Sequence, residues 1–237
     1  MKIIISTFLL GMALSSNAQF HKSDKVVPMF THGFGGSFQQ FDGLNSRVAN
    51  LSQFKQLKDY TATLGLGWLK DHNHVISSGS ITLGSSMSGD RDEKSSTIRY
   101  AAINADLGYD VVKSEKVMFY PFVGLGFQHY QAIFFKDNSA VPFDDVLQSS
   151  TTKNTISSVR FNNSFFVYRA GLGFSVQPPK CPGSSIGIQA GYAGSFKDQA
   201  WKSNENQALG NAPKDKIGQV FANIVFISTP KFMNGKK

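Results

Sequence analysis

Apolar residues alternate with small or polar residues along much of this chain, with the period of two that is typical of a β-strand. The alternation is clearest at residues 64–68, 123–127 and 170–174, where two glycines separate three apolar residues. Successive side chains of a strand point to opposite faces, so each segment has one bulky apolar face and one nearly bare face. A tightly curved closed sheet needs little side-chain volume inside, and it can turn its apolar face outward to lipid. The pattern predicts a small transmembrane β-barrel.

The alternation recurs often enough for eight strands, separated by connections of unequal length. The strands are expected near residues 29–41, 59–70, 75–88, 97–112, 117–135, 161–177, 184–197 and 217–228. The long connections between them are 42–58, 89–96, 136–160 and 198–216, and the others are short turns. Outer-membrane barrels have long loops outside the cell and short turns in the periplasm. We therefore expect an all-β fold, an eight-stranded antiparallel up-and-down transmembrane β-barrel with both termini periplasmic.

Aromatic residues are predicted to form girdles at the two membrane surfaces, where their amphipathic rings are favoured. The periplasmic girdle is expected to contain Trp68, Tyr109, Phe119 and Phe174. The exterior girdle is expected to contain Tyr60, His129, Tyr130 and Phe196.

The first residues resemble a secretory signal peptide. Lys2 precedes an apolar run of about 12 residues, which is shorter than the roughly 20 needed for a spanning helix. A small-x-small site at Ser16-Asn17-Ala18 predicts cleavage near Ala18, and no cysteine follows that would indicate a lipoprotein. The expected organisation is a signal peptide at 1–18, a periplasmic segment at 19–28, the barrel at 29–228 and a periplasmic basic tail at 229–237.

The chain is basic, with 24 Lys and Arg against 16 Asp and Glu and a formal net charge of +8. These basic residues are scattered through the expected loops without a nucleic-acid recognition motif, so nucleic acid is not an expected partner. Attraction to anionic headgroups accounts for the charge, and outer-membrane lipid and lipopolysaccharide are the expected partners. The single cysteine, Cys181, excludes an internal disulfide framework.

The signal peptide, the Gly-x-Gly strands and the loop asymmetry together resemble a known group of proteins. Residues 26–228 resemble the small outer-membrane barrels of the OmpA-barrel and OmpX kind, and more closely the outer-membrane β-barrel domain common among Bacteroidota. Length and topology are also similar to PorT-like barrels tied to type 9 secretion. The resemblance implies a structural or accessory subunit of a secretion or assembly complex in the outer membrane, which binds other outer-membrane or periplasmic proteins through its loops or its wall.

Charged residues are predicted inside the barrel as well as in the loops. Asp106 and Arg169 are expected to form an ion pair in the lumen, because a charge in a confined interior is costly unless it is paired. Asp110, Gln189, Gln219 and Asn223 are expected to complete a closed polar network, since eight strands leave an interior that side chains can fill. A narrow channel remains the alternative.

An enzyme that modifies lipid A is a second alternative, because such chemistry exists on this scaffold. It requires a nucleophile and a base within hydrogen-bond reach and a third group that orients the base. The histidines to consider are His32, His72, His74 and His129, and His129 has no evident acid partner. Ser164 is expected near the exterior end of its strand, and no His-x-Ser arrangement is present. The histidines and acidic residues also offer too few ligands for a metal site. We expect a protein that is not an enzyme and binds no cofactor.

The first long loop contains apolar residues at spacings of three and four, which predict a short amphipathic helix. They are Leu44, Val48, Leu51, Phe54 and Leu57. Either this helix packs over the barrel mouth as a lid, or it is a contact surface for another protein, and we name it as the candidate partner-binding loop. The third long loop presents the same two alternatives at residues 141–147. A third possibility is that both loops simply extend strands above the membrane.

Overall fold

The computed structural model describes residues 28–90, 93–112, 114, 116–179, 181 and 183–229. The expected signal peptide at 1–18 lies outside the described residues. All but the last residue of the segment 19–28, and all but the first residue of the tail 229–237, also lie outside them.

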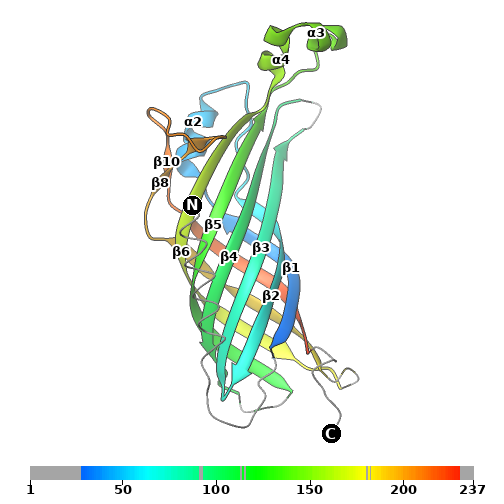
Figure 1. Ribbon diagram of the computed structural model, residues 1–237, viewed down its shortest axis with the longest axis vertical. Coiled ribbons are helices and arrows are strands. Elements are labelled where there is room, and N and C mark those ends of the chain that lie inside the picture. Colours follow the sequence, from blue (N-terminus) through cyan, green and yellow to red (C-terminus); the bar gives the residue numbers. More distant parts are fainter. Residues whose placement is uncertain are drawn as a thin grey trace.

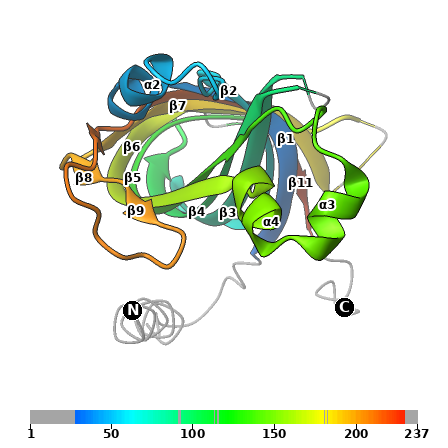
Figure 2. The same ribbon diagram turned by 90° about the horizontal axis from the view of Figure 1, so that it is seen from above.

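Eight long antiparallel strands close into a barrel (Figures 1 and 2). They are β1 (Met29–Gln39), β2 (Tyr60–His72), β3 (Val75–Gly89), β4 (Ser95–Tyr109), β5 (Val117–Phe135), β6 (Val159–Val176), β7 (Ser184–Ser195) and β11 (Gly218–Ser228). Each strand pairs with the next along the chain, and β1 pairs with β11 to close the ring. The predicted fold class is confirmed.

The helices and the short strands lie at one end of the barrel, which we call the loop end (Figure 1). They are α2 (Asp42–Ala49), α3 (Phe143–Gln148), α4 (Ser150–Ile156), β8 (Gln199–Ala200), β9 (Lys202–Ser203) and β10 (Lys214–Asp215). The opposite end, the turn end, contains the short turns. We number the loop-end connections 1 to 4 in chain order. Loop 2, predicted long at 89–96, is short, because β3 and β4 continue to pair as far as Gly89 and Ser95.

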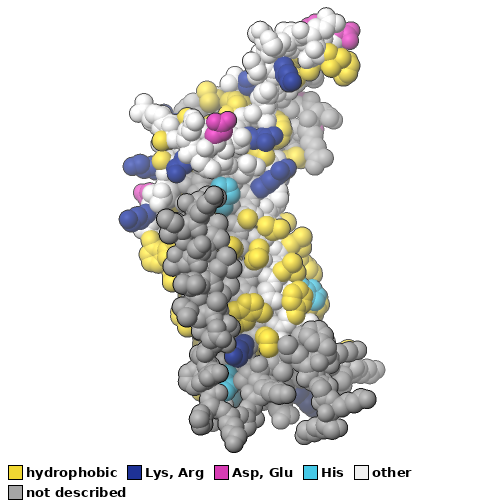
Figure 3. Space-filling model, viewed as in Figure 1, with side chains coloured by type: hydrophobic (Ala, Val, Ile, Leu, Met, Phe, Trp, Pro, Cys, Tyr) yellow, Lys and Arg dark blue, Asp and Glu magenta, His cyan; other side chains and the backbone are white. Residues whose placement is uncertain are grey.

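The outer wall of the barrel carries an apolar belt. Exposed apolar residues alternate with buried or half-buried ones along the strands, as predicted, and Leu64 is 67% exposed. The belt comprises Phe34, Leu64, Leu66, Ile81, Leu83, Ile103, Leu107, Val123, Leu125, Phe127, Phe166, Leu172, Ile188, Val220 and Ile224. On the visible face, apolar side chains gather along the strands, and Lys and Arg gather nearer the helices (Figure 3). Within the described part of the chain, no helix or strand covers this belt, so it faces lipid and the barrel is of the transmembrane kind.

Among the described residues, no helix is both long enough and apolar enough to cross a membrane.

The inward glycines make room for aromatic rings that fill the lumen. A Cβ atom added to Gly173 would lie 2.2 Å from Cζ of Tyr120, and one added to Gly84 would lie 2.2 Å from Cε1 of Tyr100. The bare face predicted from the sequence is therefore occupied by the rings of the residues paired with these glycines on the neighbouring strands. An alanine at either position would force a buried ring to move.

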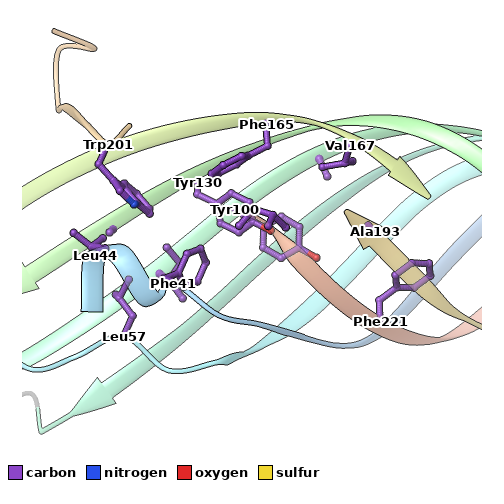
Figure 4. Packing of buried hydrophobic residues seen from close by; sticks show 14 of the residues in the cluster. Phe41, Leu44, Leu57, Tyr100, Tyr130, Phe165, Val167, Ala193, Trp201 and Phe221 are labelled. Carbon is purple, nitrogen blue, oxygen red and sulfur yellow. The ribbon is translucent and has the colours of Figure 1, made fainter. Parts of the chain in front are cut away.

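Aromatic side chains also close the barrel toward the loop end. Phe41 packs edge-on against Tyr130, with ring centroids 5.3 Å apart, and against Trp201, at 6.0 Å. Tyr130 in turn stacks on Tyr100 at 5.2 Å. Figure 4 shows these rings from strands, loop 1 and loop 4 converging in one cluster. Because neighbouring rings fill the space between the strands, the lumen is closed below the mouth of the barrel.

The outer belt yields a direct test of which face meets lipid. Replacing Leu66 with Arg places a charge near the middle of the belt on β2 and should destabilise the inserted barrel by about 2–4 kcal/mol. The urea midpoint for folding into lipid vesicles, followed by heat-modifiable migration on a gel, measures the change. Leu51→Arg is the matched control, since Leu51 is an exposed leucine of loop 1. Equal loss of stability in both variants would contradict the assignment of the belt to lipid.

Candidate functional site

The lumen contains a buried ion pair. Arg169 Nη1 lies 3.3 Å from Asp106 Oδ2, so the structure brings together the two residues that the sequence predicts to pair. The guanidinium carbon of Arg169 lies 4.9 Å from the centroid of the Phe221 ring and 6.0 Å from that of Phe122. The cation is thus held between a carboxylate and two ring faces, which fixes its position across the barrel.

One hydrogen bond crosses the lumen on the loop-end side of this ion pair, and a second bond within β5 supports it. Gln128 Nε2 donates to Gln219 Oε1 at 2.8 Å, and the Tyr130 hydroxyl donates to Gln128 Oε1 at 2.9 Å. Next to them is a cavity of about 20 Å³, which Arg169 and Asn104 help to line. This volume is enough for about one water molecule.

A second hydrogen bond crosses the lumen on the turn-end side. Gln189 Nε2 donates to the Tyr120 hydroxyl at 2.6 Å. Asp110, predicted to join the lumen network, instead accepts the backbone N–H groups of Val112 and Phe119 at 3.1 and 3.0 Å. It lies at the end of β4, where the chain turns, and its carboxylate is used by that turn. The filled lumen favours a closed barrel over a narrow channel.

Loop 1 and loop 4 are joined at the mouth by one carboxylate. Asp215 of β10 accepts the backbone N–H groups of Gly43 at 2.7 Å and Leu44 at 3.2 Å, and the indole N–H of Trp201 at 2.6 Å. Phe41 at the N-cap of α2 has no side-chain oxygen to accept those two amides. Asp215 therefore caps α2 from loop 4, at the positive end of the helix dipole.

The apolar residues of loop 1 mostly face inward. Leu44, Val48 and Leu57 are buried in the cluster at the mouth, and Phe54 packs against it, with its ring 5.8 Å from that of Phe134. Leu51 remains exposed. This burial is the packing that the lid alternative predicts, and partner binding by loop 1 stays a prediction for which Leu51 is the accessible residue.

The helix in loop 1 is also shorter than the apolar spacing suggests. It ends at Ala49, and the chain then returns toward β2. Leu57 is held there because its N–H donates to Asn45 Oδ1 at 2.8 Å and its carbonyl accepts from Asn45 Nδ2 at 3.1 Å.

Loop 3 differs from loop 1, because its apolar residues point into solvent. The strands that carry it, β5 and β6, have 19 and 18 residues, and α3 and α4 project beyond the barrel (Figure 1). Phe143 is 74% exposed and Leu147 is 70% exposed, the largest values for large apolar side chains in the described part of the chain. They are four residues apart on α3, so they lie on one face of the helix.

Most of the expected girdle aromatics lie on the outer wall. Tyr60, Trp68, Tyr109 and Phe174 are exposed there, and Phe119 is half-buried. The exterior girdle needs one correction. Tyr130 is fully buried inside the barrel, because consecutive residues of β5 point to opposite faces and His129 has the outward position.

The register of β5 and β6 creates one polar pair on the outer wall that the sequence did not reveal. His129 lies opposite Ser164, two pairs toward the loop end from Phe127 and Phe166 of the belt. The distance between His129 Nδ1 and Ser164 Oγ is 2.9 Å. In the described residues, no ion pair of His129 with a carboxylate is present.

A metal centre has no candidate within the described ranges, where no three His, Cys, Asp or Glu side chains are grouped to hold an ion.

No protein-family model and no curated protein matches the sequence. Among solved structures, the chain is similar to Ail, the attachment invasion locus protein of Yersinia pestis in complex with the heparin analogue sucrose octasulfate. The identity is 16%, the match covers 86% of this chain and 99% of that chain, and the TM-score is 0.48. The chain is also similar to a major outer membrane protein from Thermus thermophilus, with 9% identity and a TM-score of 0.49, and the match covers 84% of this chain and 98% of that chain. A third similar structure is the outer membrane protein OprG from Pseudomonas aeruginosa, with 17% identity and a TM-score of 0.44, and the match covers 87% of this chain and 97% of that chain. Identities this low do not transfer a ligand, an activity or a partner to this chain.

Proposed function

We propose that this protein is a non-enzymatic outer-membrane barrel that presents loop 3 to a protein partner at the cell surface. The apolar belt supports insertion in a membrane, and the filled lumen argues against transport through the barrel. Long connections at one end and short turns at the other support an orientation with the loop end outside and both termini in the periplasm. Basic residues beyond the belt, such as Arg99 and Arg160, are placed to contact lipopolysaccharide phosphates.

The observation that carries this proposal is the exposed apolar face of α3. Exposure of Phe143 and Leu147 to water at the tip of two extended strands contributes no stability to the protein, and exposed apolar patches of this kind mark interaction sites. Asp144 and Asp145 lie beside them in the same helix. Their negative charge disfavours contact with anionic lipid and favours a protein groove that is apolar inside and basic at its edge.

Loop 3 is tested by a double substitution, Phe143→Ser with Leu147→Ser. Burial of two such side chains contributes about 3 kcal/mol or more, so binding of the partner should weaken about a hundredfold. Crosslinking on whole cells and purification in mild detergent identify the partner, and its affinity for parent and variant is then measured. The barrel should remain folded, because both side chains are largely exposed to solvent.

Leu51→Ser with Leu209→Ser is the matched control, since both residues are exposed leucine positions of other loop-end connections. The control should keep the partner. Retention of every partner by the loop 3 variant would contradict the proposal. The identity of a partner that is lost decides whether the complex is a secretion or assembly machine, as the family resemblance implies.

A lipid-modifying enzyme is the second candidate function, and the pair of His129 and Ser164 is the observation that favours it. A hydroxyl and an imidazole within hydrogen-bond distance can act as nucleophile and base. They lie at the loop-end edge of the belt, where lipid ester groups are expected to meet the protein.

The enzymatic alternative predicts that Ser164→Ala and His129→Ala each abolish a change in lipid A that the parent protein causes. Mass spectrometry of lipid A from cells with and without the gene measures that change. Thr97→Ala, a change of a hydroxyl residue on neighbouring β4, should leave it intact. Identical lipid A in the deletion strain and the parent strain would exclude this function.

A further inference from the structure

An apolar pocket of about 130 Å³ opens in the mouth of the barrel, separate from loop 3. Loop 1 contributes Leu44 and Phe54, the strands contribute Phe134 and Phe161, and loop 4 contributes Trp201 and Pro213. Figure 4 shows Leu44 and Trp201 at this edge of the apolar cluster.

The pocket faces the mouth and not the lipid. Phe134 has the same parity on β5 as the inward residue Tyr130, and Phe161 has the same parity on β6 as the inward residue Phe165. A ligand therefore reaches the pocket from the water at the loop end, and the acyl chains of the surrounding bilayer do not.

Arg47 is the one charged residue among those that line the pocket, and all the others are apolar. Its Nη2 donates to the backbone carbonyl of Asn211 at 3.4 Å, which tethers the guanidinium to loop 4. The lining surface is apolar, so Arg47 lines the pocket with its aliphatic stem. Its guanidinium is exposed outside this lining, where it can bind the anionic group of a ligand whose apolar part lies in the pocket.

We propose that this pocket binds a small water-borne amphiphilic anion, with an apolar group of about six carbon atoms inside and a carboxylate at Arg47. The size follows from the volume, since an apolar protein cavity of similar volume, about 150 Å³, binds benzene. The carboxylate follows from Arg47, the one cationic residue of an otherwise apolar site. This binding does not depend on loop 3 or on the proposed protein partner.

The test uses 6-bromohexanoate, because bromine quenches the fluorescence of a tryptophan that it contacts. The protein is purified in detergent as the Trp68→Phe variant, which leaves Trp201 of the pocket as the reporter. Saturable quenching of Trp201 is expected. Ala212→Phe, which fills the pocket from loop 4, should weaken quenching at least tenfold.

The carboxylate is tested separately with Arg47→Gln. This change should weaken binding of 6-bromohexanoate about threefold, as expected for an exposed ion pair, and should not affect neutral 6-bromohexanol. Equal affinity of the acid and the alcohol in the parent would overturn the anionic part of the proposal.

Quenching that does not saturate, or that is equal in the parent and Ala212→Phe, would overturn the pocket itself. Absence of quenching in the parent would also overturn the proposal that the pocket binds a small molecule. The remaining occupant would then be a side chain of a partner protein. Heat-modifiable migration confirms that each variant is folded, and Leu209→Phe is the second filling variant if Ala212→Phe fails to fold.

Discussion

Replacing Arg169 with alanine is expected to lower the free energy of unfolding of the barrel by about 3–5 kcal/mol. The substitution leaves the carboxylate of Asp106 in the lumen without its cation, 11% exposed and far from bulk water. It also removes the guanidinium that packs over the rings of Phe221 and Phe122. The urea dependence of unfolding from lipid vesicles measures the loss.

The double variant Asp106→Leu with Arg169→Met separates these two causes. Replacement of a buried ion pair by apolar residues of similar size is often neutral, so this variant should be more stable than Arg169→Ala alone. If Arg169→Ala unfolds at the same urea concentration as the parent, the ion pair contributes nothing to the closed lumen. Conductance measurements on Arg169→Ala in planar bilayers show in addition whether the pair helps to keep the barrel closed.

The alternation of apolar and small residues was sufficient to predict the barrel, because side-chain direction in a strand depends only on parity. The outward positions of Leu64, Leu66 and Trp68 follow from it directly. The same rule corrects the placement of Tyr130, since a residue next to outward His129 must point inward. The strand ends were less predictable, because β3 and β4 continue to pair beyond the belt.

Contacts between the loops could not be predicted, because they depend on the ring closure that brings distant segments together. Asp215 caps a helix that lies 171 and 172 residues earlier in the chain, and no local pattern indicates that partner. The pair of His129 and Ser164 depends in the same way on the register of β5 and β6, which are separated by a long loop. A register different by two residues would place another residue opposite His129.

The amphipathic segments of loop 1 and loop 3 present the same alternatives in the sequence. In the structure, the apolar face of loop 1 is mostly buried, whereas that of loop 3 is exposed. Spacing of three and four shows that a helix has an apolar face, but it does not show what that face contacts. In loop 1 the face covers the mouth, because Asp215 and Trp201 hold α2 against it. In loop 3 the strands β5 and β6 carry α3 away from the barrel, and its apolar face stays in solvent.

The mouth is expected to depend on Trp201 more than on any other single loop residue. Trp201→Ala removes a fully buried ring that packs on Phe41, together with the N–H that donates to Asp215. Loss of a buried tryptophan costs about 3–5 kcal/mol, and here the cost should fall on the local stability of loops 1 and 4. The strands do not depend on this ring for their pairing, so the barrel should stay folded in lipid. Amide hydrogen exchange across residues 42–58 and 198–216 measures the local opening.

Trp201→Phe is the matched control, because it keeps most of the ring and removes the N–H donor. Asp215 would still accept the amides of Gly43 and Leu44, so the loss should be smaller, about 1–2 kcal/mol. The lid would then open less often than in Trp201→Ala. Parent-like protection of both loops in Trp201→Ala would show that α2 is held over the mouth by strand contacts alone, and that the joint formed by Asp215 and Trp201 does not hold the lid.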